Sequence, residues 1–500
     1  MVADDLGEGT LCVDTGFRTD TDQFTFANFG RSPVADLNVT VQTLIDLFGH
    51  STVCMPGPET QCVLRPRTRQ KLDEWNVALG GGRCEGMAAL SQRMFMRYET
   101  PDEYAGGATT TAELEQGNTR LAQAIVYWWA TQFVPEVARP AAESRTRTPL
   151  QLVDELIRGL ANGVGHTVGM YYGGAGHSVT PFAVTRRGGD YVIHVYDNNQ
   201  PGVRAEIVVN GADNTWTFAN GRSGEESTAV WSGATGTLEL TPMVARQGPF
   251  TCPFCDDPTP NAGTTLTVTN QADAPANYLF VDAGDAGTIE QTASGLTIGI
   301  AGATVENAKA GTTSSLTVTL PAGLRDTRVE LRHVREQVTE SVVTVRRPAM
   351  ADLQVRNARS TGTVGAARIT HPLLELTADG TTVHATLGDT LVSLAGATNL
   401  TTVTVAADDT LVVSRISSDS VEVSYRGTTG TASTRVTLNP GNSTVTQLVP
   451  GKGTLGATSR EVSAQPVGAA RTTRAEPLPR TTPTSTVRTT VPSIDVTLPG

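Results

Sequence analysis

The stretch Gly80-Gly81-Gly82-Arg83-Cys84-Glu85-Gly86-Met87 places a cysteine where a glycine-rich turn meets a predicted helix. Met87, Leu90 and Met94 recur at helical spacing, so Cys84 is expected in the first turn of that helix. The unpaired amides and the positive end of a helix stabilise a thiolate there, and the amide of Cys84 can donate to an oxyanion. Taken alone, a cysteine beside glycines is more often a buried structural residue.

A histidine precedes the first strand of a predicted hairpin further along the chain. His177 follows the glycine-rich segment 173–176, and the strands of the hairpin are expected at 179–185 and 191–196. The second strand ends in Asp197-Asn198-Asn199, and pairing about the glycine turn brings these residues opposite His177. One of the three can therefore accept the ring N–H of His177 and fix its tautomer. A slip of one residue swaps the faces, so the three alternatives stay open.

Together these motifs resemble the papain-like cysteine peptidase superfamily, and they are closest in texture to bacterial Cys-His-Asp/Asn members related to the transglutaminase-like branch. The resemblance covers residues 17–202. It implies that Cys84 is the nucleophile, that His177 is the general base and acid, and that Asp197 or Asn198 orients the histidine. Papain takes a side-chain oxyanion donor from a position that is Val77 here, so the neighbouring Asn76 is the candidate donor.

The chemistry implied by this resemblance is acyl transfer through a thioester. The Cys84 thiolate is expected to attack a peptide bond, and water is expected to resolve the acyl-enzyme. One alternative is a transglutaminase-like or amidase activity, in which an amine replaces water. Another is a catalytically inactive papain-like domain within a surface adhesin or interaction protein. We expect a protein or peptide substrate, no cofactor and no metal.

Charge and cysteine usage restrict the partners and the compartment. A net charge of −12 disfavours nucleic acid as a partner, and no apolar run is long enough for a transmembrane segment. The segment Met1 to Thr10 lacks the pattern of an export signal. Two closely spaced pairs, Cys54 with Cys62 and Cys252 with Cys255, nevertheless predict disulfides. We therefore expect a secreted or cell-surface protein whose signal is absent from this chain; the alternative is a cytoplasmic protein or an injected effector.

The chain is expected to contain several domains, because 500 residues exceed what one core usually organises. Helical patterns precede strand patterns in residues 1–260, which predicts an α+β papain-like domain. Period-two alternation then predicts all-β, sandwich-like modules at 261–347 and 348–460, divided at Arg346-Arg347-Pro348, which are expected to bind a protein or a surface polymer. Residues 461–500 are rich in Thr, Pro and Arg and are expected to form a disordered tail.

Helices in the first domain are predicted at Asn38–Phe48, Thr68–Leu79, Cys84–Tyr98, Thr111–Phe133 and Pro149–Ala161. Strands are predicted at Thr167–Tyr172, Val179–Thr185, Tyr191–Tyr196, Ala205–Val209 and Thr215–Ala219.

Overall fold

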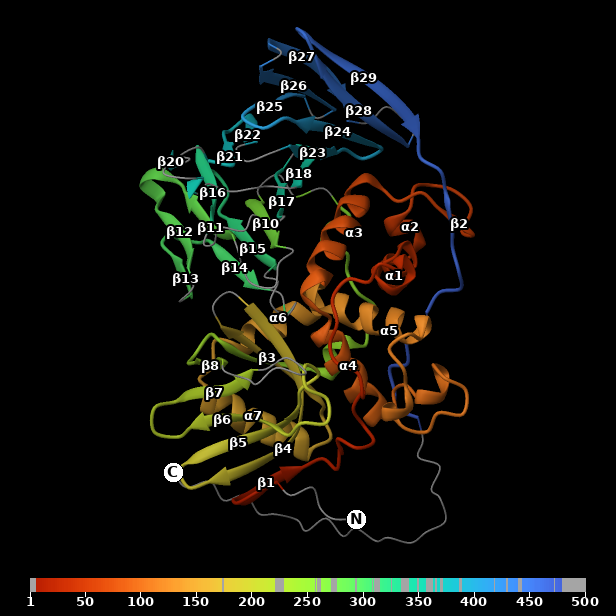
Figure 1. The fold of residues 1–500 in the computed structure, drawn as a ribbon, viewed down its shortest axis with the longest axis vertical. Coiled ribbons are helices and arrows are strands. Elements are labelled where there is room, and N and C mark those ends of the chain that lie inside the picture. The colour runs from red at the N-terminus through yellow and green to blue at the C-terminus, as the bar shows by residue number, and fades with distance from the viewer. Residues whose placement is uncertain are drawn as a thin grey trace.

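A computed structural model provides the fold of the chain. It describes residues 6–172, 175–220, 229–256, 258, 262–270, 277–292, 295–307, 309, 315–324, 326–333, 341–348, 350–356, 363–364, 367–368, 372–385, 389–417, 419–428, 430–438, 443–471 and 473–478. Figure 1 shows an α+β part, made by the N-terminal half of the chain, and a part made of strands. The predicted fold class, α+β followed by all-β, is confirmed at this level.

Seven α-helices are described in the α+β part. They are α1 (Val41–Phe48), α2 (His50–Val53), α3 (Pro66–Ala78), α4 (Cys84–Phe95), α5 (Thr119–Ala130), α6 (Pro135–Ser144) and α7 (Pro149–Ala161). The prediction of one helix over Thr111–Phe133 is wrong in its first half, because the chain forms a short 3-10 turn and a loop before α5. The helix α7 begins as predicted. Thr148 caps it, Pro149 is its first residue, and Thr148 and Gln151 form a capping box.

The helix that carries Cys84 packs very closely on α5. A Cβ atom at Gly86 would lie 2.0 Å from the carbonyl oxygen of Ile125 and 2.9 Å from the Cβ of Trp129. Both neighbours are buried in the core of the helical region, so neither can move without disturbing that core. The glycine two residues after the cysteine therefore sets the distance between α4 and α5.

Replacing Gly86 by alanine should destabilise the protein by about 2 kcal/mol or more, because overpacking outweighs the gain in helix propensity. Denaturant unfolding of the two proteins measures this difference. The matched control is Gly117→Ala, where no atom lies within 4 Å of the added Cβ, and where the change should stay within about 0.5 kcal/mol. Equal effects at the two sites would contradict the close packing of α4 on α5.

One sheet completes the α+β part. Its strands are β1 (Thr10–Asp14), β3 (His166–Tyr172), β4 (Ala175–Arg187), β5 (Asp190–Tyr196), β6 (Ala205–Asn210), β7 (Thr215–Asn220), β8 (Ala229–Gly233) and β9 (Leu238–Pro242). Their order is β8-β7-β6-β5-β4-β3-β9, with β1 also paired to β4. Val195 packs in the core that contains α7, whereas its neighbour Tyr196 packs in the core of the other helices. Because consecutive residues face opposite sides of a strand, helices cover both faces of this sheet.

The all-β part consists of two nine-stranded sheets in the described residues. The first has the order β14 (Thr304–Asn307), β15 (Ser315–Leu320), β10 (Thr264–Asn270), β17 (Ser341–Arg346), β18 (Asp352–Arg356), β23 (Thr390–Ala395), β24 (Asn399–Val405), β28 (Thr444–Gly451) and β29 (Thr454–Glu461). The second has the order β13 (Gly295–Ile298), β12 (Thr288–Thr292), β11 (Asn277–Asp282), β16 (Thr327–His333), β21 (Leu374–Leu376), β22 (Gly380–His384), β25 (Thr410–Ser417), β26 (Ser420–Gly427) and β27 (Gly430–Thr437). A two-stranded ribbon, β19 (Thr363–Val364) with β20 (Ala367–Arg368), lies outside both.

The predicted boundary at Arg346-Arg347-Pro348 lies inside these sheets. Strands β17 and β18, on either side of it, pair antiparallel, and one hydrophobic core runs from Leu266 to Leu448. The division into separate modules at 261–347 and 348–460 is therefore corrected to one continuous pair of sheets. The proline and arginines resemble a linker in sequence, but the chain makes only a short turn there.

The α+β part and the sheets contact each other directly through α3. The side-chain amide of Gln70 donates to the backbone oxygens of Asp352 and Ser393, at 3.2 and 3.1 Å. Arg67 pairs with the Asp352 carboxylate at 3.2 Å. Gln70, Asp352 and Ser393 are buried, so the contact is part of the packed structure.

The tail predicted over 461–500 is not disordered in its first half. The short strand β30 (Gln465–Pro466) pairs with β2 (Gln61–Cys62), and Arg471 binds the buried Glu99 carboxylate and the Tyr104 hydroxyl. The amide of Leu478 donates to the Arg97 carbonyl at 2.7 Å. The prediction is therefore wrong for residues 465–471 and 473–478, and residues 472 and 479–500 lie outside the described part of the chain.

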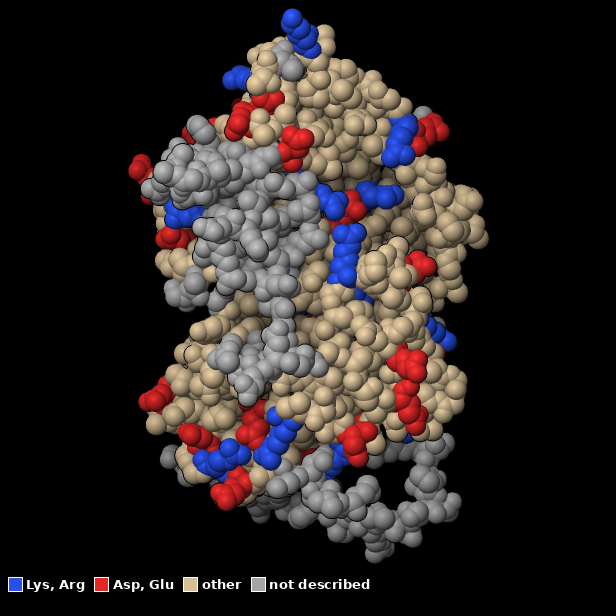
Figure 2. Space-filling model, in the orientation of Figure 1, with Lys and Arg blue, Asp and Glu red and all other residues tan. Residues whose placement is uncertain are grey.

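On the face drawn in Figure 2, acidic and basic side chains are scattered among uncharged residues. Within the described residues, no helix is both long enough and apolar enough to cross a bilayer.

Candidate active site

Cys84 is the first residue of α4, as predicted. A 3-10 turn, Leu79–Gly81, leads to Gly82, whose φ of +126° favours glycine. A Cβ at Gly82 would also meet the side chain of Asn28, whose Oδ1 accepts the Arg83 amide at 2.8 Å. The thiol is fully buried, and the Cys84 amide lies in the first turn, where a helix provides no acceptor. This amide is therefore an available donor beside the sulfur.

His177 and Asp197 form a buried pair. The ring Nε2 of His177 lies 2.7 Å from Oδ1 of Asp197, and both side chains are about 1% exposed. His177 is carried by β4 and Asp197 follows β5, whose pairing ends at Thr180 opposite Tyr196. The hairpin thus brings its open ends together as the sequence indicates, and Asp197 is the partner among the three alternatives. Gly173 and Gly174, in the segment before His177, lie outside the described residues.

The other ring nitrogen of His177, Nδ1, is not used in the bond to Asp197. Nδ1 is buried and has no hydrogen-bond partner of ordinary length among the described residues. Burial alone would lower the pKa of His177, but the Asp197 carboxylate and, to a smaller extent, the Cys84 thiol outweigh burial and raise this pKa to about 10. The ring is therefore an imidazolium at neutral pH. Such a ring can stabilise a neighbouring thiolate and can donate a proton to a leaving group.

Asn198 does not contact the His177 ring, so its predicted role as the orienting residue is wrong. Its side-chain amide donates to the carbonyl oxygens of Cys84 and Ser178, at 3.2 and 2.8 Å. Asn198 thus joins the start of α4 to β4, which fixes the distance between the cysteine and the histidine. Asn199 extends this scaffold, because its amide donates to Asp197 and its Oδ1 accepts from Asn28.

Asn76 is also not part of the site, so the oxyanion candidate is corrected. Its side chain forms two hydrogen bonds with the backbone of Val39, an N–H to Oδ1 bond of 3.1 Å and an Nδ2 to O bond of 3.0 Å. Both functional atoms of the Asn76 amide are therefore used within the helical region. The Cys84 backbone amide remains the donor that the geometry supports.

Aromatic side chains enclose the histidine. The rings of Phe218 and Trp231 lie 6.2 and 6.5 Å from the His177 ring, measured between centroids. Trp231 is stacked in turn on Tyr172. These rings exclude water from the His177–Asp197 pair. Trp231 is a residue that sequence reasoning missed, because β8 was not predicted.

One contact with the thiol comes from the all-β part. The Sγ atom of Cys84 lies 3.9 Å from the backbone oxygen of Lys309, which follows β14. Lys309 is 225 residues away in sequence and is itself buried. The thiol of Cys84 therefore contacts the backbone of Lys309, a residue that lies far from it in sequence.

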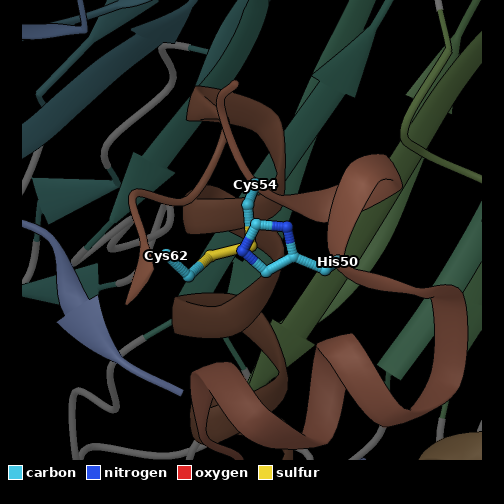
Figure 3. A group of neighbouring side chains, drawn as sticks. All are labelled: His50, Cys54 and Cys62. Carbon is cyan, nitrogen blue, oxygen red and sulfur yellow. A yellow bond between two sulfur atoms is a disulfide. The ribbon is translucent and has the colours of Figure 1, made fainter. Parts of the chain in front are cut away.

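The two predicted disulfides are formed, Cys54 with Cys62 and Cys252 with Cys255. His50 lies beside the first of them, within reach of both sulfur atoms (Figure 3). Because those sulfurs are bonded to each other, they provide no thiolate ligand, and the His50 Nε2 lies 2.8 Å from the Gln61 carbonyl oxygen. The three residues therefore form a structural cluster and not a metal site.

Comparisons with protein-family models, with curated proteins and with solved structures found no match to this chain.

Proposed function

We propose that the chain is a cysteine peptidase that cleaves peptide bonds through a thioester on Cys84. The proposal depends on the buried pair of His177 and Asp197, which leaves Nδ1 of the ring without a hydrogen-bond partner among the described residues, and on the Cys84 thiol, which helps to raise the pKa of that ring. A raised pKa also stabilises a structural ion pair, but here the Cys84 thiol contributes to raising the pKa of His177, and a catalytic imidazolium has to lie beside a thiol in this way.

The proposed reaction uses four groups of this chain. The Cys84 thiolate attacks the carbonyl carbon of the substrate, and the developing oxyanion accepts a hydrogen bond from the Cys84 amide. The His177 imidazolium donates its Nδ1 proton to the leaving amine, so the C–N bond breaks and a thioester remains. Neutral His177 then takes a proton from water, which attacks the thioester and releases the acid and the thiol. Asp197 holds the ring orientation throughout.

The site is enclosed by chain segments, which favours hydrolysis of a positioned peptide over a role as an exposed adhesive surface. Two disulfides support a proposed secreted or cell-surface location, because such bonds persist in oxidising compartments.

Mass spectrometry of peptide termini tests this function. We expect the Lys309→Ala chain to create new termini in a mixture of denatured proteins, and the wild-type chain, in which Lys309 contacts the thiol, to create fewer. The same chains carrying Cys84→Ala should create none. Termini that form equally with and without Cys84 would contradict the proposal.

A further inference from the structure

Lys309 lies in the candidate site like a bound substrate residue. Its backbone oxygen faces Cys84 Sγ at 3.9 Å, and its amide donates to Oε1 of Gln132 at 2.6 Å. Its side chain is 3% exposed and enters a polar pocket next to the start of α4. A peptidase needs the same arrangement for the substrate residue on the acyl side of the bond that it cleaves. The backbone of that residue has to lie beside the nucleophile, and its side chain has to enter an adjoining pocket.

One end of the pocket is acidic, and its floor is formed by a glycine. The Lys309 Nζ contacts Oε1 of Glu239, and it lies 3.3 Å from both Oε2 of Glu85 and Oγ1 of Thr241. The lysine stem runs over Gly169, where a Cβ would lie 2.7 Å from the Lys309 Cδ. The shape therefore accepts a long, straight side chain, and the end accepts hydrogen-bond donors.

Each glutamate uses one oxygen for an arginine and presents the other to the lysine. Oε2 of Glu239 accepts from Arg145 and from the Tyr171 hydroxyl, both at 3.0 Å. Burial would raise the pKa of Glu239, but Lys309 and Arg145 outweigh it and hold this pKa below its ordinary value. Glu239 is therefore ionised, and its remaining oxygen accepts from the Lys309 ammonium and, at 3.5 Å, from the Thr241 hydroxyl.

Glu85 repeats this arrangement beside the nucleophile. Its Oε1 pairs with the buried Arg246 and accepts from Thr167 at 3.3 Å. Its Oε2 has no hydrogen-bond partner among the described residues, and the Lys309 ammonium lies 3.3 Å from it. Without the lysine, two buried carboxylate oxygens would face the empty pocket, which is costly in a site closed to water.

We propose that the pocket formed by Glu85, Glu239, Thr241 and Gly169 selects a lysine side chain on the acyl side of the cleaved bond, and that Lys309 is a built-in occupant that keeps this site closed. The inference rests on the proposed peptidase function and names its substrate class. A cavity of about 210 Å³ between the α+β part and the sheets is lined by Lys309 and Glu239 but not by Cys84 or His177. Lys309 thus separates this cavity from the nucleophile.

Alkylation of Cys84 by two matched probes tests the inference. The probes are short peptidyl chloromethyl ketones that differ only in having lysine or norleucine at the reactive end. Intact mass and peptide mapping give the rate at Cys84 in the full-length chain. We expect Lys309→Ala to be alkylated about 10-fold faster than wild type, with at least about a 10-fold preference for the lysyl probe. Adding Glu239→Gln should remove most of this preference.

Two further variants make the result specific. Lys309→Met removes the ammonium that binds Glu85 and Glu239 and so should release the side chain and behave like Lys309→Ala, which guards against an effect of misfolding. Lys71→Ala is the matched control, because Lys71 lines the same cavity but pairs with Glu74 at 2.8 Å. It should leave the rate at Cys84 as in wild type.

The outcomes distinguish a failure of the lysine pocket from a failure of the peptidase function. Equal rates for the two probes in Lys309→Ala would overturn the lysine pocket while leaving a reactive Cys84. A rate in both Lys309 variants no higher than in wild type would overturn the built-in occupant. If Cys84 never reacts faster than Cys12, the other free cysteine of the chain, the peptidase proposal itself fails, and the pocket with it.

Discussion

Alanine at Cys84 or at His177 should lower the rate of peptide cleavage by on the order of 10⁴-fold or more, and both replacements together should lower it no further. The two groups act as one unit, since the thiol is a poor nucleophile without the ring and the ring has nothing to activate without the thiol. Once either is lost, only positioning and the Cys84 amide remain to assist the reaction.

The measurement is kcat/KM on a lysine-containing peptide, with each replacement made in the Lys309→Ala chain. His194→Gln provides the control, because His194 is also buried in the hairpin but bonds Thr185 at 2.9 Å and lies away from the thiol. The kcat/KM of that variant should stay within about 3-fold of that of its parent, because the replacement leaves the geometry of the site unchanged. Single losses that multiply in the double variant would show that Cys84 and His177 act independently.

Replacing Asp197 by alanine should lower kcat by about 100-fold or more, whereas asparagine should preserve much of the rate. Alanine removes the acceptor for Nε2, so the ring loses its fixed orientation and tautomer. Asparagine keeps an oxygen at this position and removes only the charge. The comparison of kcat for the two variants therefore separates orientation of the ring from electrostatic support of the imidazolium.

The same pair of variants predicts a pH dependence. The pKa of His177 is raised to about 10 in the folded chain, against an ordinary value of about 6.5, so the stability it contributes is complete below pH 6.5. That contribution is lost as pH rises through 10. Asp197→Asn should lower the pKa of the ring, and the difference in unfolding free energy from wild type should shrink between pH 6.5 and 10. A His177 ring that titrates near 6.5 in wild type, followed by NMR, would contradict the buried ion pair.

The placement of Cys84 at a helix start and of His177 beside the end of its hairpin could be predicted from sequence, because each has a local signal. A glycine turn before a helical pattern marks Cys84, and a tight hairpin relates His177 to the residues after its second strand. The choice of Asp197 needed the structure, since strand register alone cannot distinguish neighbouring residues. Asn76 was selected by nearness in sequence, but the phase of α3 turns its side chain towards Val39.

Contacts between distant segments could not be predicted. Lys309 lies in a Thr- and Ala-rich strand region with no feature that relates it to Cys84, and only tertiary packing brings them together. Likewise, Arg471 lies in a stretch whose composition is typical of disorder, yet its guanidinium satisfies the buried Glu99. In both cases a buried charge from one segment pairs with a charge from a distant segment. Composition and periodicity describe neighbouring residues, so they cannot predict such a pair.

The most direct test of the central claim is whether an acyl group becomes attached to Cys84 during turnover. The Lys309→Ala chain would be mixed with an activated ester of a lysine peptide, and the reaction would be quenched with acid within milliseconds. The mass of the intact protein would then be measured by mass spectrometry. We expect a mass increase equal to that of the acyl group, located on Cys84. Hydroxylamine should release this group, and the Cys84→Ala chain should not acquire it. Accumulation of product with no adduct on Cys84, or an adduct that also forms in Cys84→Ala, would contradict the central claim.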